Sequence, residues 1–143
     1  MAILEEELKV IADKLIVATD DGSNGTQGFV TNMLEAEILA GEKFDEVIAI
    51  GPLVMMKFVC ELTKKYDIPT TVSMNPVMID GTGMCGGCRV IVDGETKFAC
   101  VDGPDFNGYE VDFDEAMSRA SMYSDFERHS YEKACNLFKK EVK

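Results

Sequence analysis

Basic side chains are scarce in this chain of 143 residues, in which 14 lysines and arginines face 26 aspartates and glutamates for a formal net charge of -12. That balance argues against nucleic acid or an anionic membrane surface as a partner, because both attract positive charge. The sequence also has no signal peptide, no long apolar run and no lipidation motif. We therefore expect a soluble cytoplasmic protein.

Only one histidine is present, His129, and it lies among charged residues of an expected helix, where it should be exposed. The five cysteines are an odd number, and three of them lie within residues 85–100. This pattern suits metal ligation in a reducing compartment better than a disulfide framework. Cys60 and Cys135 occupy helical positions and are expected to be small buried hydrophobic side chains.

A glycine-rich stretch carries the clearest functional signal. It reads Asp80-Gly-Thr-Gly-Met-Cys85-Gly-Gly-Cys88 and is followed, after eleven further residues, by Cys100. This is the C-x4-C-x2-C…C spacing of plant-type iron-sulfur sites, with aspartate in the first position. The spacing predicts a cluster ligated by Asp80, Cys85, Cys88 and Cys100, and therefore a role in electron transfer.

The stretch between the last two cysteines has the pattern of a β-hairpin. Two β-rich runs are joined by Asp93-Gly94, the favoured pair for a two-residue type I′ turn. The expected cross-strand pairs are Val92 with Glu95, Val90 with Lys97, Cys88 with Ala99 and Gly87 with Cys100. Such a hairpin returns Cys100 to Cys88, while the glycines of residues 81–87 allow backbone amides to approach cluster sulfides.

Other readings of this segment remain open. Zinc could use three thiolates and a carboxylate, although only one Cys-x2-Cys knuckle and no nearby histidine are present. A Cys85–Cys88 disulfide could form in an oxidised protein that has lost its metal. Asp80 could cap the glycine-rich loop without binding metal.

The first half of the chain alternates between strand and helix patterns. We expect strands over residues 15–19, 46–50 and 70–74 and helices over residues 30–40 and from Gly51-Pro52 onward, with Thr31 as an N-cap and Gly41 as a stop. Such alternation predicts an α/β fold with a doubly wound parallel sheet, which binds ligands at the carboxyl ends of its strands. The loop at residues 20–25 and the Gly51-Pro52 corner both follow expected strands.

The pattern changes after residue 76. The cluster segment is followed by residues 102–108, which we expect to form turns, and then by helix starting at Asp112 or Asp114. The carboxylates in this region fit no EF-hand spacing and are expected to be solvated turn and helix-start acids.

Several of these segments also resemble the ferredoxin-NADP reductase-like electron-transfer subunits, which carry a 2Fe-2S cluster after a nucleotide-binding domain. The resemblance covers nearly the whole chain and includes Ile16-Val-Ala-Thr-Asp-Asp-Gly-Ser, Gly28-Phe-Val-Thr31, Ala49-Ile-Gly-Pro52, Asn75-Pro76, the Asp80 to Val90 stretch and Phe98-Ala-Cys-Val-Asp-Gly-Pro104. Dihydroorotate dehydrogenase electron-transfer subunits are similar too, but they carry cysteine where this chain has Asp80. That residue favours the branch with the small subunits of NADH-dependent ferredoxin:NADP oxidoreductases.

The resemblance implies roles for residues that spacing alone does not assign. It implies that Asp80 is a cluster ligand beside the three cysteines. It also implies that NAD(P)H contacts two segments, comprising Asp20, Asp21, Gly22 and Ser23 in the first and Gly51, Pro52, Met55 and Met56 in the second. Family members begin with a flavin-binding barrel and a glycine-rich turn, and neither is found here, so we expect a C-terminal portion with its FAD site mainly elsewhere.

The resulting prediction is an α/β chain with three parts. Residues 1–76 would be part of an NAD(P)-binding domain, residues 77–108 a 2Fe-2S module and residues 109–143 a helical tail. We expect an oxidoreductase subunit that passes electrons between NAD(P)H, flavin and the cluster to a larger partner subunit, and indirectly to ferredoxin, although this portion alone should be inactive. The alternatives are a dihydroorotate dehydrogenase electron-transfer subunit and a zinc-stabilised interaction module.

Overall fold

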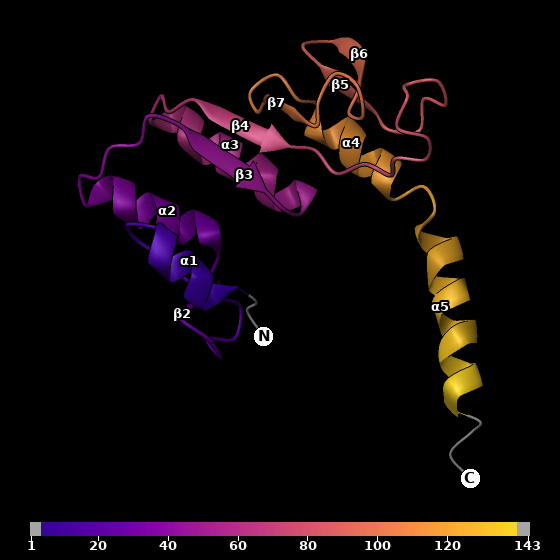
Figure 1. The fold of residues 1–143 in the computed structure, drawn as a ribbon, viewed down its shortest axis with the longest axis horizontal. Coiled ribbons are helices and arrows are strands. Elements are labelled where there is room, and N and C mark those ends of the chain that lie inside the picture. The colour runs from indigo at the N-terminus through magenta and orange to yellow at the C-terminus, as the bar shows by residue number, and fades with distance from the viewer. Residues whose placement is uncertain (1–3, 140–143) are drawn as a thin grey trace.

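A computed structural model describes residues 4–139 of the chain, which form five helices and seven short strands (Figure 1). In chain order the elements are α1 (Glu5–Ile11), β1 (Ala18–Thr19), β2 (Thr26–Gln27), α2 (Val30–Leu39), β3 (Val47–Ile50), α3 (Leu53–Lys65), β4 (Thr70–Ser73), β5 (Arg89–Val92), β6 (Glu95–Phe98), β7 (Asp105–Asn107), α4 (Phe113–Ala120) and α5 (Ser124–Lys139). Among these described residues, no helix has the length and apolar character needed to cross a membrane.

The largest sheet has the strand order β3-β4-β7. β3 and β4 are parallel and are connected through α3, as the alternating pattern predicted. β7 joins β4 in the antiparallel direction, with Val72 opposite Phe106. The prediction of turns alone over residues 102–108 was wrong here, because Gly103-Pro104 before the three-residue strand and Gly108 after it hide its pattern in the sequence.

The amino-terminal segment departs from the expected sheet. Of residues 15–19 only Ala18 and Thr19 form a strand, and β1 pairs with β2 rather than with β3. Residues 17–25 instead fold back on themselves: the Thr26 amide donates to the Val17 carbonyl at 2.8 Å, and a Cβ on Gly25 would lie 2.2 Å from that same oxygen. This tight loop uses backbone groups that a longer strand would need for pairing.

β3 consequently forms an edge of its sheet within the described part of the chain. Ile48 is 64% exposed and Ile50 is 70% exposed, although isoleucine is among the residues most often buried. Their neighbour Ala49 faces the other side of the strand and is buried. One face of β3 therefore contributes to the core while the other is uncovered.

Helix ends follow the expected signals in part. Asp112, one of the two predicted start residues, is the N-cap of α4 and accepts the Glu115 amide at 2.9 Å. α2 begins at Val30 with Phe29 as its N-cap, so Thr31 lies inside the helix and the prediction for that residue was wrong. Gly41 follows the C-cap with a φ of 97°, a conformation that suits glycine at a helix end.

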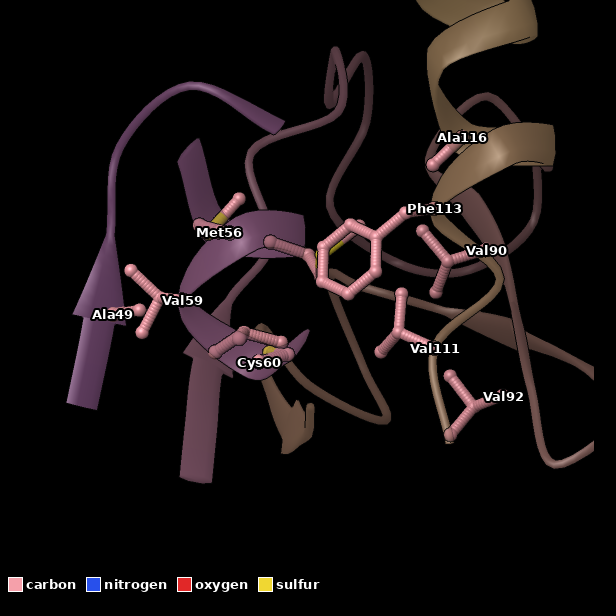
Figure 2. Packing of buried hydrophobic residues seen from close by; sticks show 11 residues of the cluster. Ala49, Met56, Val59, Cys60, Val90, Val92, Val111, Phe113 and Ala116 are labelled. Carbon is pink, nitrogen blue, oxygen red and sulfur yellow. The ribbon is translucent and has the colours of Figure 1, made fainter. Parts of the chain in front are cut away.

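One hydrophobic core connects α3 and the main sheet to the β5–β6 hairpin and α4. Phe113 extends from the start of α4 toward α3 and lies beside Val90 and Val111 (Figure 2). Met56, on α3, is completely buried in the same cluster. The buried members are Ala49, Met56, Val59, Cys60, Val72, Met74, Val90, Val92, Val111, Phe113 and Ala116.

The two cysteines outside the glycine-rich motif differ in what the structure describes. Cys60 is buried on α3, as predicted, and burial raises the pKa of its thiol to about 11. A thiol with so high a pKa carries little thiolate at neutral pH and behaves as a hydrophobic side chain. The side chain of Cys135 lies outside the described residues. His129 is exposed on α5, as predicted.

Phe113→Ala should lower the free energy of unfolding by about 3–5 kcal/mol, because it removes a buried aromatic ring from the contact between α3, α4 and the hairpin. The matched control is Phe126→Ala on α5, where the ring is 73% exposed. That control should change the free energy by less than about 0.5 kcal/mol. Urea unfolding followed by circular dichroism measures both values, and equal midpoints for the two variants would contradict the assignment of this core.

Candidate metal centre

The expected hairpin is present with the expected register. Val92 pairs with Glu95 and Val90 with Lys97. The connecting Asp93 and Gly94 both have positive φ, 51° and 74°, as a type I′ turn requires. The Asp93 amide donates to the Glu110 carbonyl at 2.8 Å, so the tip of the hairpin is attached to the segment that leads into α4.

At its open end the hairpin brings Cys88 and Cys100 together. The Ala99 amide donates to the Cys88 carbonyl at 3.0 Å, which continues the β5–β6 pairing by one residue, as predicted. Cys88 is only 2% exposed and Cys100 is half-buried. The neighbouring Cys88 side chain, together with burial, raises the pKa of the Cys100 thiol.

Asp80 organises the loop that precedes the hairpin. Its Oδ1 accepts the Thr82 amide at 2.8 Å, and its Oδ2 accepts the Cys85 amide at 3.1 Å. These hydrogen bonds, led by the Thr82 amide, hold the pKa of the Asp80 carboxyl below its usual range. In this geometry the carboxylate caps the glycine-rich loop, which is the alternative role left open by the sequence.

Cys85 lies on the outside of this loop and is exposed. Its Sγ accepts the Gly87 amide at 3.4 Å, the kind of contact that orients a sulfur ligand. Gly83, two residues earlier, has a φ of 80°, and a Cβ there would lie 3.1 Å from Val101. The loop therefore needs glycine at this position both for its backbone conformation and for its contact with the segment after Cys100.

The four predicted ligands thus form two pairs on adjoining segments. The loop and the hairpin end are in contact, because a Cβ on Gly83 would lie 3.1 Å from Val101. Within the described residues, however, no three histidine, cysteine, aspartate or glutamate side chains converge closely enough to hold a metal ion. Full assembly would require Asp80 and Cys85 to turn toward the Cys88–Cys100 pair.

The donor set fits an iron-sulfur cluster in its chemistry. Three thiols and one carboxylate lie within 21 residues of chain, on one loop and one hairpin end. Thiolates are the ligands that such clusters prefer, and the Gly87 amide already donates to the sulfur of Cys85. Asp102 was not predicted to take part in this site. Its carboxylate accepts the Phe98 amide at 2.7 Å. The signal available in the sequence was its position, four residues after Phe98 of the expected hairpin.

The residues predicted to contact a nucleotide lie on two separate sheets. Asp20–Ser23 form a turn after β1, where Asp21 Oδ1 accepts the Ser23 amide at 3.0 Å and the hydroxyl and amide of Ser23 hold the pKa of the Asp21 carboxyl below its usual range. Gly51 and Pro52 join β3 to α3. Met55 is half-buried against Gly51, whereas Met56 is completely buried.

A groove of about 750 Å³ opens in the amino-terminal part of the chain. Its lining contains none of the predicted ligands or nucleotide contacts, and an ion pair between Lys14 and Glu37 lies at its side. The lining residues are Asp13, Lys14, Ile16, Ala18, Val30, Met33, Leu34, Glu37, Glu42 and Phe44. No pattern in the sequence pointed to this groove.

Known proteins match both the cluster segment and the chain as a whole. Residues 75–112, which include all four predicted ligands, match the iron-sulfur cluster binding domain of dihydroorotate dehydrogenase B. The chain is 50% identical over 131 residues to a dihydroorotate dehydrogenase B electron transfer subunit homolog from Thermotoga maritima, and 37% identical over 110 residues to the electron transfer subunit of that enzyme from Clostridium perfringens. These matches cover 92% and 77% of this chain.

A solved structure of NADH-dependent reduced ferredoxin-NADP oxidoreductase, described for flavin-based electron bifurcation, superposes with a TM-score of 0.79 at 48% sequence identity. The superposition covers 91% of this chain and 46% of that protein. The matches to the Thermotoga maritima and Clostridium perfringens relatives cover 46% and 43% of those proteins. The chain therefore spans less than half the length of the relatives it matches. Over most of its length it is similar to part of these electron-transfer proteins, and its residues 75–112 match the iron-sulfur cluster binding domain.

Proposed function

We propose that this chain is part of an electron-transfer oxidoreductase subunit and that Asp80, Cys85, Cys88 and Cys100 ligate a 2Fe-2S cluster. The observation that carries the proposal is that the β5–β6 pairing continues to the Ala99 amide and the Cys88 carbonyl, which places Cys88 and Cys100 at the same end of the hairpin. The loop that bears the other two donors lies against Val101 at that end. All four lie inside the matched iron-sulfur domain. When bound, a 2Fe-2S cluster accepts and donates single electrons.

The chain contributes position and environment to that site. Cys88, buried and fixed by the β5–β6 pairing, supplies a rigid ligand, while the exposed loop brings Cys85 to it. The Gly87 amide reduces negative charge on the Cys85 sulfur. Exposed apolar side chains flank the loop and offer a surface that a partner can cover to exclude water, namely Val77, Met78, Ile79, Met84 and Val101.

Nucleotide and flavin complete the proposal. We assign NAD(P)H contacts to Asp20, Asp21, Gly22 and Ser23 and to Gly51, Pro52 and Met55; Met56 is buried, so its part is to fix the start of α3. Both segments follow strands at their carboxyl ends, where α/β folds bind ligands. FAD, which accepts hydride and releases single electrons, would bind mainly in the part of the family polypeptide that these 143 residues do not match.

The proposed partner is a larger subunit that contains flavin or iron-sulfur clusters. Electrons would reach ferredoxin only through that subunit. The proposed compartment is the cytoplasm, which keeps thiols reduced. The second candidate is the electron-transfer subunit of a dihydroorotate dehydrogenase, which the names of several relatives favour. Isolation of the partner from the native host separates the two: a dihydroorotate-oxidising subunit would support the second.

A zinc-stabilised module is tested by metal analysis, since zinc without iron or sulfide would replace the cluster assignment.

Cys85→Ser, Cys88→Ser and Cys100→Ser should each abolish the cluster after anaerobic reconstitution, because each removes one of four ligands. Cys60→Ser and Cys135→Ser are the controls, and the buried Cys60 lies on α3, outside the loop and hairpin. Iron and acid-labile sulfide per chain, together with visible absorption, provide the measurement. A normal cluster in the Cys100→Ser variant would remove that residue from the ligand set.

Asp80 can be tested for its two roles separately. Asp80→Cys should retain a cluster with a shifted midpoint potential and an altered electron paramagnetic resonance spectrum, whereas Asp80→Ala should make the cluster labile. Asp80→Asn keeps a side-chain acceptor for one of the Thr82 and Cys85 amides but removes the carboxylate. We expect Asp80→Asn to resemble Asp80→Ala; a cluster of wild-type potential and stability in Asp80→Asn would instead make Asp80 only a loop cap.

The 143 residues alone should oxidise NADH and NADPH at no more than a background rate, because hydride needs the flavin. A chimera that adds the unmatched part of the Thermotoga maritima relative should gain nucleotide-dependent bleaching of the cluster absorption. Stopped-flow spectroscopy under anaerobic conditions measures this directly. Rapid NADH oxidation by the unextended chain would contradict the assignment of the flavin site to the remainder of the polypeptide.

A further inference from the structure

Cys100 lies inside a tight backbone turn that begins at the end of β6. The Phe98 carbonyl accepts two amides, from Val101 at 3.0 Å and from Asp102 at 2.8 Å. In the opposite direction the Asp102 Oδ2 accepts the Phe98 amide at 2.7 Å. Phe98 and Asp102 are therefore joined by hydrogen bonds of both main chain and side chain, and Cys100 lies midway between them in the sequence.

The hairpin register explains why Phe98 needs this side-chain acceptor. Phe98 pairs with Arg89, and the next pair along is hydrogen-bonded through the Ala99 amide and the Cys88 carbonyl. Because hydrogen-bonded and non-hydrogen-bonded pairs alternate in an antiparallel ladder, the Phe98 amide points away from β5. No third strand lies there among the described residues, and the Asp102 carboxylate takes its place.

The same turn contacts the glycine-rich loop. Val101 is packed against Gly83, where an added Cβ would lie 3.1 Å away, so the loop lies against the residue that follows Cys100. The conformation of residues 98–102 thus decides where the Cys100 sulfur lies with respect to both Cys88 and the loop that carries Cys85. Loss of the Phe98–Asp102 bond would free the end of this turn that follows Cys100.

We propose that Asp102 is a positioning residue for the metal centre: its carboxylate, by binding the Phe98 amide, holds Cys100 beside Cys88. The proposal rests on the ligand role assigned to Cys100 above. Asp102 acts through the backbone and does not itself contact the cluster. Asparagine at this position keeps an acceptor oxygen for the Phe98 amide and loses only the charge, so it separates positioning from electrostatics.

The first experiment compares reconstituted wild-type protein with Asp102→Ala and Asp102→Asn. Asp102→Ala should release iron to a chelator about tenfold faster, as expected for the loss of a charge-assisted hydrogen bond, and Asp102→Asn should stay within about threefold of wild type. The matched control is Asp105→Ala, which removes the charge of an exposed carboxylate that takes part in no hydrogen bond or ion pair among the described residues. Thermal unfolding of each apo-protein monitors the fold.

The second experiment uses no cluster. In a Cys85→Ser/Cys135→Ser background, phenylarsine oxide bridges two neighbouring thiols and reports how often Cys88 and Cys100 are adjacent. Asp102→Ala should weaken its binding by about tenfold, and Asp102→Asn should restore most of the affinity. Cys60 stays in this background because it lies on α3, outside the loop and the hairpin, and the arsenical bridges only thiols that lie side by side.

The two measurements give a clear decision. Equal iron release and equal arsenical affinity in Asp102→Ala and wild type would overturn the positioning role, as would an Asp102→Asn variant that behaves like Asp102→Ala in both assays. If the wild-type chain takes up no iron and sulfide, the proposed cluster is refuted, and the arsenical affinities alone then decide whether Asp102 positions Cys100.

Discussion

The burial of the β5–β6 hairpin against α3 and α4 is the contact on which the candidate metal centre depends. An isolated two-stranded hairpin is marginally stable in water, and here Val90 and Val92 gain a buried surface from Phe113 and the side chains of α3. Backbone hydrogen bonds from Asp93 to Glu110 and from Asp112 to Ile91 add attachment along the hairpin. Cys88 and Cys100 lie at the open end of this ladder. The distance between them therefore depends on how the hairpin packs against Phe113 and α3.

The two halves of the candidate site differ in physical character. The hairpin half is buried and tied into the core, whereas the Asp80 to Cys85 loop is exposed and owes its shape to carboxylate–amide bonds and glycine conformations. The Asp80 carboxylate has both oxygens engaged by amides, and ligation would have to compete with those bonds. A rigid pair of thiols and an adaptable loop together suit a site that closes around a preformed inorganic group.

Local signals in the sequence were sufficient for the hairpin, its register, the α4 cap at Asp112 and the parallel β3–β4 pair, because each depends on a few neighbouring residues or on a repeated pattern. β7 was not found, since its pairing with β4 is nonlocal and glycine and proline surround it. The strand expected over residues 15–19 is present only as the short β1, because backbone bonds within residues 17–28 outweigh the apolar character of residues 15–17. The role of Asp102 was not predicted, because an acidic residue in a turn is common and its partner, the Phe98 amide, is identified only by the structure.

The uncovered side of β3 has a consequence for handling the protein. An edge strand with Ile48 and Ile50 exposed has neither the charged side chains nor the proline that usually protect such edges from pairing with another chain. Its free backbone groups and apolar face together make a template for strand addition between molecules. The 143 residues in isolation are therefore expected to lose material to self-association as concentration rises, independently of the redox state of their cysteines.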